Sequence, residues 1–343
     1  MSSNGKASVR KTTLMPPILE SRRADSARRL GELKAELDDA ARLVHGCSCV
    51  YLTGSFGRGE ASPHSDLDLF IASRGAKDSP ALSRLNEIRL KAKLIEAAQE
   101  HKFPEFSKDG QFLTNYTVDE LIGTLGKPED DSNNTFTARL LLLLESRSLI
   151  GEEVYKEAVG QVIESYWRDY ERHKDDFVPS FLVNDILRLW RTFCVNYEAR
   201  TKSADEIQRA KRRSKNFRLK HSRLLTCYSG IVYLLGVSVL KKTVSQEDAV
   251  AMTGMTPTER LEWVAREKRF AAGHKSVQQI LDLYSKFLEQ TGEAEEKLLT
   301  RFRDTNQAQI LFQQADDLGN RIYELLFAIG SDGKSTLYRH LVV

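Results

Sequence analysis

Apolar residues in the first part of the chain change from helical to strand-like spacing. They recur every three or four positions from Leu30 to Val44, which predicts an amphipathic helix over about 21–45. Two short runs of β-prone residues follow, at 49–53 and 67–72. Turn-forming residues lie between these runs, so we expect two strands joined by a compact connection.

The next apolar pattern is again helical. Ser79 and Pro80 supply a cap and a proline suited to a first turn, which predicts a helix beginning there. Its apolar face would carry Leu82, Leu85, Ile88, Ala92 and Ile95. A third extended segment is expected over about 103–116.

The second half of the chain has almost wholly helical spacing from about Thr135 onward. Thr256 and Glu259 have the spacing of a capping box. Asn184 and Asp185 are residue types that favour the first positions of a helix, and we expect them to cap one, with contact to a nucleotide as the alternative.

These patterns predict an α+β fold in three parts. A flexible tail over 1–20 precedes a mixed α/β domain over 21–132, and an all-helical domain covers 133–343. The polar cluster at 130–134 marks the expected boundary between the two domains.

Composition limits the class of protein. The chain has 343 residues, of which 41% are hydrophobic and 29% charged, and a net charge of +3. This is typical of a folded protein, and any site for a polyanion must come from local clustering of charge. No apolar run approaches the ~18 residues of a membrane span, and four cysteines form no disulfide or zinc pattern, so we expect a cytoplasmic protein without a membrane partner.

Chemistry is concentrated in Gly-Ser-Phe-Gly-Arg-Gly-Glu at 54–60, followed by Ser-Asp-Leu-Asp-Leu-Phe at 65–70. Glycine at a strand-to-helix turn lets the backbone approach a phosphate, and a helix N-terminus attracts anions. Gly54 and the hydroxyl of Ser55 therefore predict a triphosphate cradle.

Asp66 and Asp68 are two residues apart, so on a strand both carboxylates lie on one face while Leu67 and Leu69 pack behind. Adjacent carboxylates near a phosphate need a cation, and Mg²⁺ prefers carboxylates plus substrate phosphates. Either motif alone has an ordinary explanation, as a turn or a solvated strand edge. Together they predict a two-metal site for phosphoryl transfer, in which Mn²⁺ can replace Mg²⁺.

The two motifs resemble those of the DNA polymerase β-type nucleotidyltransferase superfamily. Their wording is most similar to the nucleotidyltransferase domains of bacterial signal-protein uridylyltransferases and glutamine-synthetase adenylyltransferases. The resemblance implies a short mixed sheet followed by a helical domain that completes the cleft for nucleotide and acceptor. It also implies that Gly54 and Ser55 bind the triphosphate, and that Asp66 and Asp68 bind two Mg²⁺ ions with a third carboxylate from a later strand.

Glu105 is our choice for that third carboxylate and metal ligand, because apolar residues flank it as in a strand. Asp109 is the alternative, and Pro104 is unusual inside a central strand. Arg58 and Glu60 are expected to form a local ion pair.

A basic run over 209–223 has eight lysines and arginines and no acid. Phe217, Leu219 and Leu224 interrupt it, so part of the segment should pack against the body and aim its cations at a fixed place. The resemblance implies that Lys220 and Ser222 hold the terminal phosphates of the triphosphate. A plain acceptor-binding surface is the alternative, because basic patches bind any polyanion.

The sequence thus predicts an Mg²⁺-dependent nucleotidyltransferase that moves a nucleoside monophosphate from a ribo- or deoxyribonucleoside triphosphate, such as ATP, to a hydroxyl. The expected acceptor is a nucleic acid or a nucleotide, extended without a template in a stress or antiphage system. The protein is expected to act as a homo-oligomer or with an effector protein. A protein-modifying uridylyl- or adenylyltransferase is one alternative. An inactive nucleotide- or nucleic-acid-binding regulator is the other.

Overall fold

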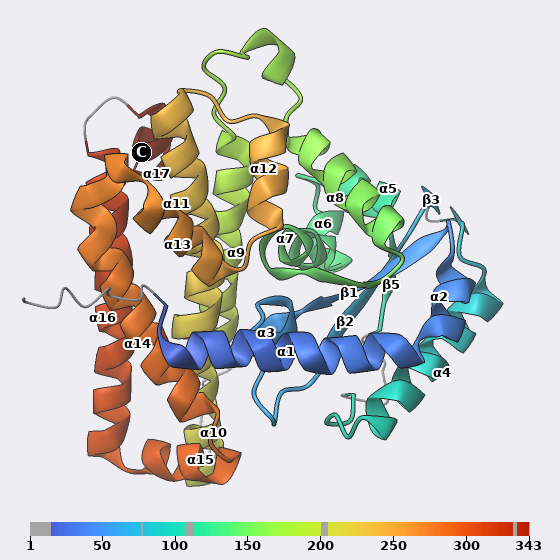
Figure 1. Ribbon diagram of the computed structural model, residues 1–343, viewed down its shortest axis with the longest axis horizontal. Coiled ribbons are helices and arrows are strands. Elements are labelled where there is room, and N and C mark those ends of the chain that lie inside the picture. Colours follow the sequence, from blue (N-terminus) through green and yellow to red (C-terminus); the bar gives the residue numbers. More distant parts are fainter. Residues whose placement is uncertain (1–14, 77, 107–112, 200–204, 332–334, 343) are drawn as a thin grey trace, which may run out of the picture.

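The computed structural model describes residues 15–76, 78–106, 113–199, 205–331 and 335–342. Residues 1–14 of the expected tail, and Asp109, lie outside them. Figure 1 shows a small sheet flanked by helices beside a larger group of helices. The α+β class expected from the sequence is confirmed.

One four-stranded sheet organises the first half, in the order β5-β2-β1-β6. Its strands are β1 (Ser48–Thr53), β2 (Asp68–Ser73), β5 (Asn115–Thr117) and β6 (Arg147–Ile150). β1 is antiparallel to β2 and β6, and β2 is parallel to β5. The strands expected at 49–53 and 67–72 are confirmed to within one residue. β6 joins the sheet from beyond 132, so residues on both sides of the expected boundary build it.

Two hydrophobic cores lie on opposite faces of the sheet. Helices α1 (Pro17–Glu36), α2 (Asp38–Val44) and α4 (Arg84–Glu100) bury apolar residues against Val50 and Ile71 on one face. Helices α5 (Val118–Gly123), α7 (Thr135–Glu145) and α8 (Glu152–Tyr166) contribute to the core on the other face, with Tyr51 and Ala72. The single helix expected over 21–45 is interrupted at Leu37, which lies between α1 and α2.

The helix expected to begin at Ser79 begins later. Strand β4 (Ser79–Pro80) pairs with β3 (Gly75–Ala76) in a small hairpin, and Ser83 caps α4 by accepting a hydrogen bond from the amide of Asn86. The predicted apolar face is also wrong, since Leu85 and Ile88 are more than half exposed.

The second half is helical, as expected. Its remaining elements are α6 (Glu129–Ser132), η2 (Tyr170–Arg172), α9 (Ser180–Ala199), α10 (Glu206–Arg218), η3 (Leu219–Arg223), α11 (Leu224–Lys241), α12 (Gln246–Thr253), α13 (Pro257–Arg266), η4 (Lys268–Gly273), α14 (His274–Thr291), α15 (Glu295–Arg303), α16 (Thr305–Gly330) and α17 (Thr336–Val342). The capping box at Thr256 and Glu259 is confirmed.

Helix α10, the π-helical turn η3 and α11 form one continuous rod over 206–241. By length and composition this rod could cross a membrane, but 78% of its apolar window is buried inside the protein. Such a helix is also typical of the core of a folded domain.

Helix α1 crosses the front of both halves (Figure 1). The guanidinium of Arg23 donates to Glu262 (2.6 Å) and to Thr258 (2.5 Å), both on α13. Arg29 of the same helix donates to the carbonyl oxygen of Ser62, in the connection between β1 and β2 (2.9 Å). One helix therefore fastens the sheet to the helical half.

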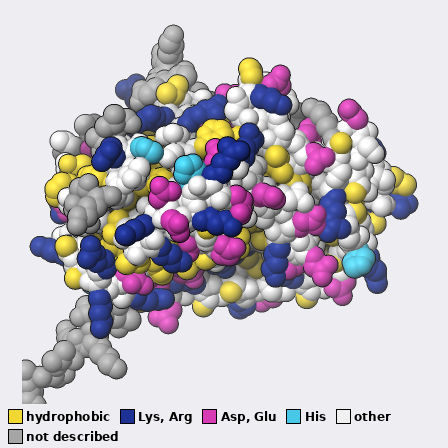
Figure 2. Space-filling model, turned by 90° about the horizontal axis from the view of Figure 1, so that it is seen from above, with side chains coloured by type: hydrophobic (Ala, Val, Ile, Leu, Met, Phe, Trp, Pro, Cys, Tyr) yellow, Lys and Arg dark blue, Asp and Glu magenta, His cyan; other side chains and the backbone are white. Residues whose placement is uncertain are grey.

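Charges of both signs are interspersed on the face shown in Figure 2. Exposed ion pairs follow the same pattern, such as Arg28 with Asp25 and Glu32. Such pairs contribute little to stability. A run of cations without acidic partners therefore differs from this interspersed pattern.

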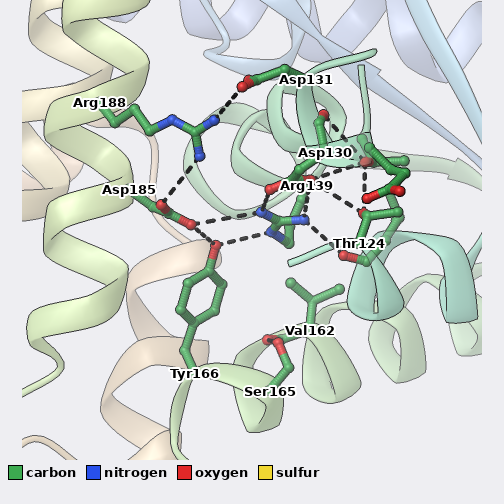
Figure 3. A network of polar contacts seen from close by, with 12 residues as sticks. Thr124, Asp130, Asp131, Arg139, Val162, Ser165, Tyr166, Asp185 and Arg188 are labelled. Carbon is green, nitrogen blue, oxygen red and sulfur yellow. Dashed lines mark hydrogen bonds and ion pairs between the residues drawn. The ribbon is translucent and has the colours of Figure 1, made fainter. Parts of the chain in front are cut away.

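A buried polar network joins α6, α7, α8 and α9 (Figure 3). Arg139 has no exposed surface and donates to both carboxylate oxygens of Asp130 (2.8 and 2.6 Å) and to the hydroxyl of Tyr166 (2.9 Å). Tyr166 in turn donates to Asp185 (2.7 Å). The expectation that Asn184 and Asp185 cap a helix is wrong, because α9 begins at Ser180 and both residues lie beyond its first turn. Asp185 instead accepts the hydrogen bond from Tyr166.

Candidate active site

The Gly-Ser bend lies against Asp68. Thr53 at the end of β1 is opposite Asp68 at the start of β2, and the single turn α3 (Gly54–Gly57) begins directly after β1. Gly54 has a φ of +64°, and a Cβ atom there would lie 2.1 Å from Oδ2 of Asp68. Glycine is required at this position because the carboxylate occupies the space of a side chain.

Asp66 and Asp68 are exposed, whereas Leu67 and Leu69 are 5% exposed and belong to the core with α1, α2 and α4. The predicted alternation of exposed and buried side chains is therefore confirmed, but β2 begins only at Asp68, so Asp66 lies in the connection before the strand. Within the part of the chain that the structure describes, neither carboxylate forms a hydrogen bond or a short ion pair. Both are available to a ligand.

The electrostatic surroundings of Asp68 favour a bound cation. Burial by the surrounding protein, followed by the charge of Asp66, raises the pKa of Asp68 to about 6, while Arg223 and Arg58 act in the opposite direction. Its side chain nevertheless keeps solvent-exposed surface. A pair of carboxylates with this repulsion and open oxygens fits a divalent metal completed by substrate oxygens.

The glycines of the motif serve contacts within the protein. A Cβ atom at Gly57 would lie 1.9 Å from the carbonyl oxygen of Glu145, so this glycine lets α3 pack on the end of α7. The amide of Gly54 donates to Oε1 of Glu145 (3.1 Å). The predicted phosphate contact through a helix N-terminus is therefore not supported, because α3 is one turn long and this amide has a partner. Among the described residues the Ser55 hydroxyl has no hydrogen-bond partner.

Glu145 is a site residue that the sequence analysis missed. It is fully buried and accepts hydrogen bonds from Gly54, Arg58 (2.7 Å), Thr226 (2.8 Å) and Arg223. Burial acts to raise the pKa of Glu145, but Arg223 and Arg58 outweigh it and hold the pKa at about 2. The sequence feature that could have indicated Glu145 is its position directly after five leucines, 140–144, at the end of a predicted buried helix.

The ion pair expected between Arg58 and Glu60 is confirmed at 2.5 Å, but it is buried. Glu60 also accepts a hydrogen bond from the hydroxyl of Tyr284 on α14 (2.7 Å). Together with the bond from Arg58 to Glu145, these contacts form a chain of hydrogen bonds and ion pairs from the helical half to the motif. The pair is part of the joint between the halves.

Glu105 does not lie on a strand. It is exposed, in the coil after α4, and lines a small hollow of about 140 Å³ with Phe103, Phe106 and Ile95. Among the residues that the structure describes, no three or more carboxylate, histidine or cysteine side chains are grouped for a metal ion. Glu105 is thus not assembled with the two aspartates. Of the segment expected to be extended over 103–116, the described residues form a strand only at β5.

Lys220 and Ser222 also have other partners. Lys220 forms an ion pair with Asp316 (2.9 Å), and the Ser222 hydroxyl donates to the carbonyl oxygen of Arg218 (2.8 Å). Two cations of the helical half interact electrostatically with the aspartates. Arg223, like Arg58 of the motif, acts to lower the pKa of Asp68, and Asp66 acts to raise the pKa of Arg218 against burial. The helical half therefore presents arginines to the carboxylates.

Residues 47–120 match the family model for the nucleotidyltransferase domain. The matched segment covers β1, α3, β2 and β5, and so includes both motifs. A comparison of the chain with curated proteins finds no match. The chain therefore contains a nucleotidyltransferase domain, consistent with the polymerase β-type superfamily.

Proposed function

We propose that the protein transfers a nucleoside monophosphate from a nucleoside triphosphate to a hydroxyl acceptor and releases pyrophosphate. The observation that carries this proposal is a pair of carboxylates inside a nucleotidyltransferase domain, Asp66 and Asp68, which have no hydrogen-bond or ion-pair partner among the described residues. Asp68 lies directly against the Gly54-Ser55 bend, and the charge of Asp66 acts on it.

Asp66 and Asp68 are the residues that would hold Mg²⁺ or Mn²⁺. Bound there, the metal supplies a Lewis acid that stabilises charge on the phosphate oxygens and on the leaving pyrophosphate. Two protein carboxylates are enough when substrate oxygens and water complete the shell, as Mg²⁺ sites often require. Separate substitution of Glu105 and Asp109 tests whether either adds a ligand.

The other side chains have separate roles in this proposal. The free hydroxyl of Ser55 donates to a phosphate oxygen. Arg218 and Arg223 balance the charge of the triphosphate from the helical half, in place of Lys220 and Ser222, because charge-assisted bonds from guanidinium to phosphate are strong and directional.

The acceptor that we favour is a nucleic acid or nucleotide, extended without a template, with a stress or antiphage system as the proposed setting. Modification of a protein side chain is the second candidate, supported by the resemblance of the motif wording. Retention of Asp66 and Asp68 argues against an inactive regulator.

Incubation with each labelled NTP and dNTP plus Mg²⁺ or Mn²⁺, with products identified by mass, tests the reaction. Asp66→Asn and Asp68→Asn should each reduce turnover by about 100-fold or more, the scale of losing one strong electrostatic contact in the transition state. Because both side chains are exposed, the melting temperature should change little.

Asp175→Asn is the matched control, since Asp175 is an exposed acid in the helical half without a partner among the described residues. It should retain full activity. Undiminished turnover in the Asp66 and Asp68 variants would remove both residues from the mechanism.

A further inference from the structure

Helix α10 exposes four cations that have no acidic partner. The side chains of Arg209, Lys211, Lys215 and Arg218 are exposed, and none forms an ion pair or hydrogen bond within the described residues. The only acid in α10 is Glu206 in its first turn. This contrasts with the interspersed charges on the face in Figure 2.

Three of these cations form one stripe. Lys211, Lys215 and Arg218 are four and three positions apart, so they lie on one face of the helix. Ala210, Ser214 and Phe217 are buried on the neighbouring face of the helix, where α10 packs against α15 and α16. Packing holds the helix in place while the cations remain available to a partner.

The stripe leads to the aspartates. Arg218 ends α10, and Asp66 is one of the two acids whose charges act on it. The π-helical turn η3 follows, and Arg223 at its end pairs with Glu145 and has a charge that also acts on Asp68. Short π-helical segments inside α-helices are frequent at functional sites.

We propose that this stripe binds the phosphate backbone of a single nucleic-acid strand whose terminal hydroxyl is the acceptor. The inference rests on the proposed function. Lys211 lies about 10 Å from Arg218 along the helix at 1.5 Å per residue. That places Lys211 beyond a triphosphate held at the aspartates and on the path of a longer polyanion.

A strand end fits these charges and the chemistry together. Its hydroxyl oxygen attacks the α-phosphorus of the nucleotide and forms a new phosphodiester bond. The bond from the α-phosphorus to the bridging oxygen breaks, pyrophosphate leaves, and the hydroxyl proton passes to water. An acidic peptide would also bind the cations, but its hydroxyls have no fixed place relative to its charges.

Binding is measured first, with labelled 20-nucleotide RNA and DNA strands and neither nucleotide nor metal. In Lys211→Ala/Lys215→Ala, fluorescence anisotropy should show an affinity for the strand that is lower by about tenfold, because two phosphate contacts are lost. The slope of log K against log salt concentration should become shallower by about 0.7 for each lost contact. Lys268→Ala/Lys275→Ala is the control, since both lysines are exposed and lie on η4 and α14; it should bind like the original protein.

Turnover is measured second. With the 20-nucleotide acceptor, KM for the strand should rise about tenfold in Lys211→Ala/Lys215→Ala, while KM for the nucleotide and the rate with a dinucleotide acceptor stay unchanged. Unchanged strand binding, or displacement of the strand by polyglutamate at equal charge, would overturn the inference. If the protein transfers nucleotides to small acceptors but neither binds nor extends strands, only the inference about the stripe is overturned. If it transfers nucleotides to no acceptor, the proposed function is overturned.

Discussion

His221 shows how one side chain can tie stability to pH. Its ring is completely buried in η3 and stacks on Phe287 with a centroid distance of 4.6 Å. Its Nδ1 lies 2.8 Å from the carbonyl oxygen of Phe217, and Nε2 has no partner within the described residues. Burial, assisted by Lys220 and opposed by the bond to Phe217, lowers the pKa of His221 to about 4.

This shift predicts a loss of stability on mild acidification. The unfolded chain takes up a proton near pH 6.5 and the folded chain only near pH 4, so the contribution of His221 is complete above 6.5 and disappears as pH falls towards 4. The part of the free energy of unfolding that depends on His221 should fall by on the order of 3 kcal/mol across this window, measured by urea titrations as the difference between the original protein and His221→Phe. In His221→Phe that fall should be absent; an equal fall in the variant would assign it to other groups.

At this scale, local spacing predicted Asp66 and Asp68 but could not predict Glu145. The aspartates are recognised by their alternation with buried leucines, which is a property of neighbours in the chain. The partners of Glu145 come from residues more than 75 positions away. No sequence pattern reports such a contact.

Among the elements, the turn α3 depends on the absence of a side chain at Gly54. Gly54→Ala should destabilise the fold by about 1–3 kcal/mol, because φ is positive and the new Cβ would overlap the carboxylate of Asp68. Turnover should fall by more than the loss of stability explains, because the carboxylate of Asp68 must move away from its position.

Gly31→Ala is the matched substitution. Gly31 lies inside α1 with no atom within 4 Å of the added Cβ, so alanine should raise stability by up to about 1 kcal/mol. Thermal unfolding and turnover of both variants check the pair. A Gly54→Ala protein as active as Gly31→Ala would contradict the close approach.

Strands and most helices could be predicted from periodicity, but the face of α4 could not. This helix has two apolar rows at helical spacing, one with Leu85 and Ile88 and one with Leu90 and Leu94. Contact with α2 and the sheet buries the second row. Spacing alone cannot choose between the rows, because the choice belongs to the tertiary structure.

For the molecule as a whole, Glu145 is the point where the two halves meet. Glu145→Gln should reduce the free energy of unfolding by about 3–5 kcal/mol, because it leaves the buried Arg58 guanidinium without its full counter-charge. Glu157→Gln, which breaks an exposed pair with Arg74, should cost no more than about 1 kcal/mol. Urea unfolding of the two variants makes the comparison. Equal losses of unfolding free energy would show that the buried ion pairs of Glu145 stabilise the fold no more than an exposed pair.

Helix α1 has a consequence for how substrates enter. Many two-part enzymes admit ligands by swinging about a hinge. Here such a swing would have to pull Arg23 from Glu262 on one side or Arg29 from Ser62 on the other. While these bonds hold α1 to both halves, we expect nucleotide and acceptor to reach the aspartates without a movement of one half against the other.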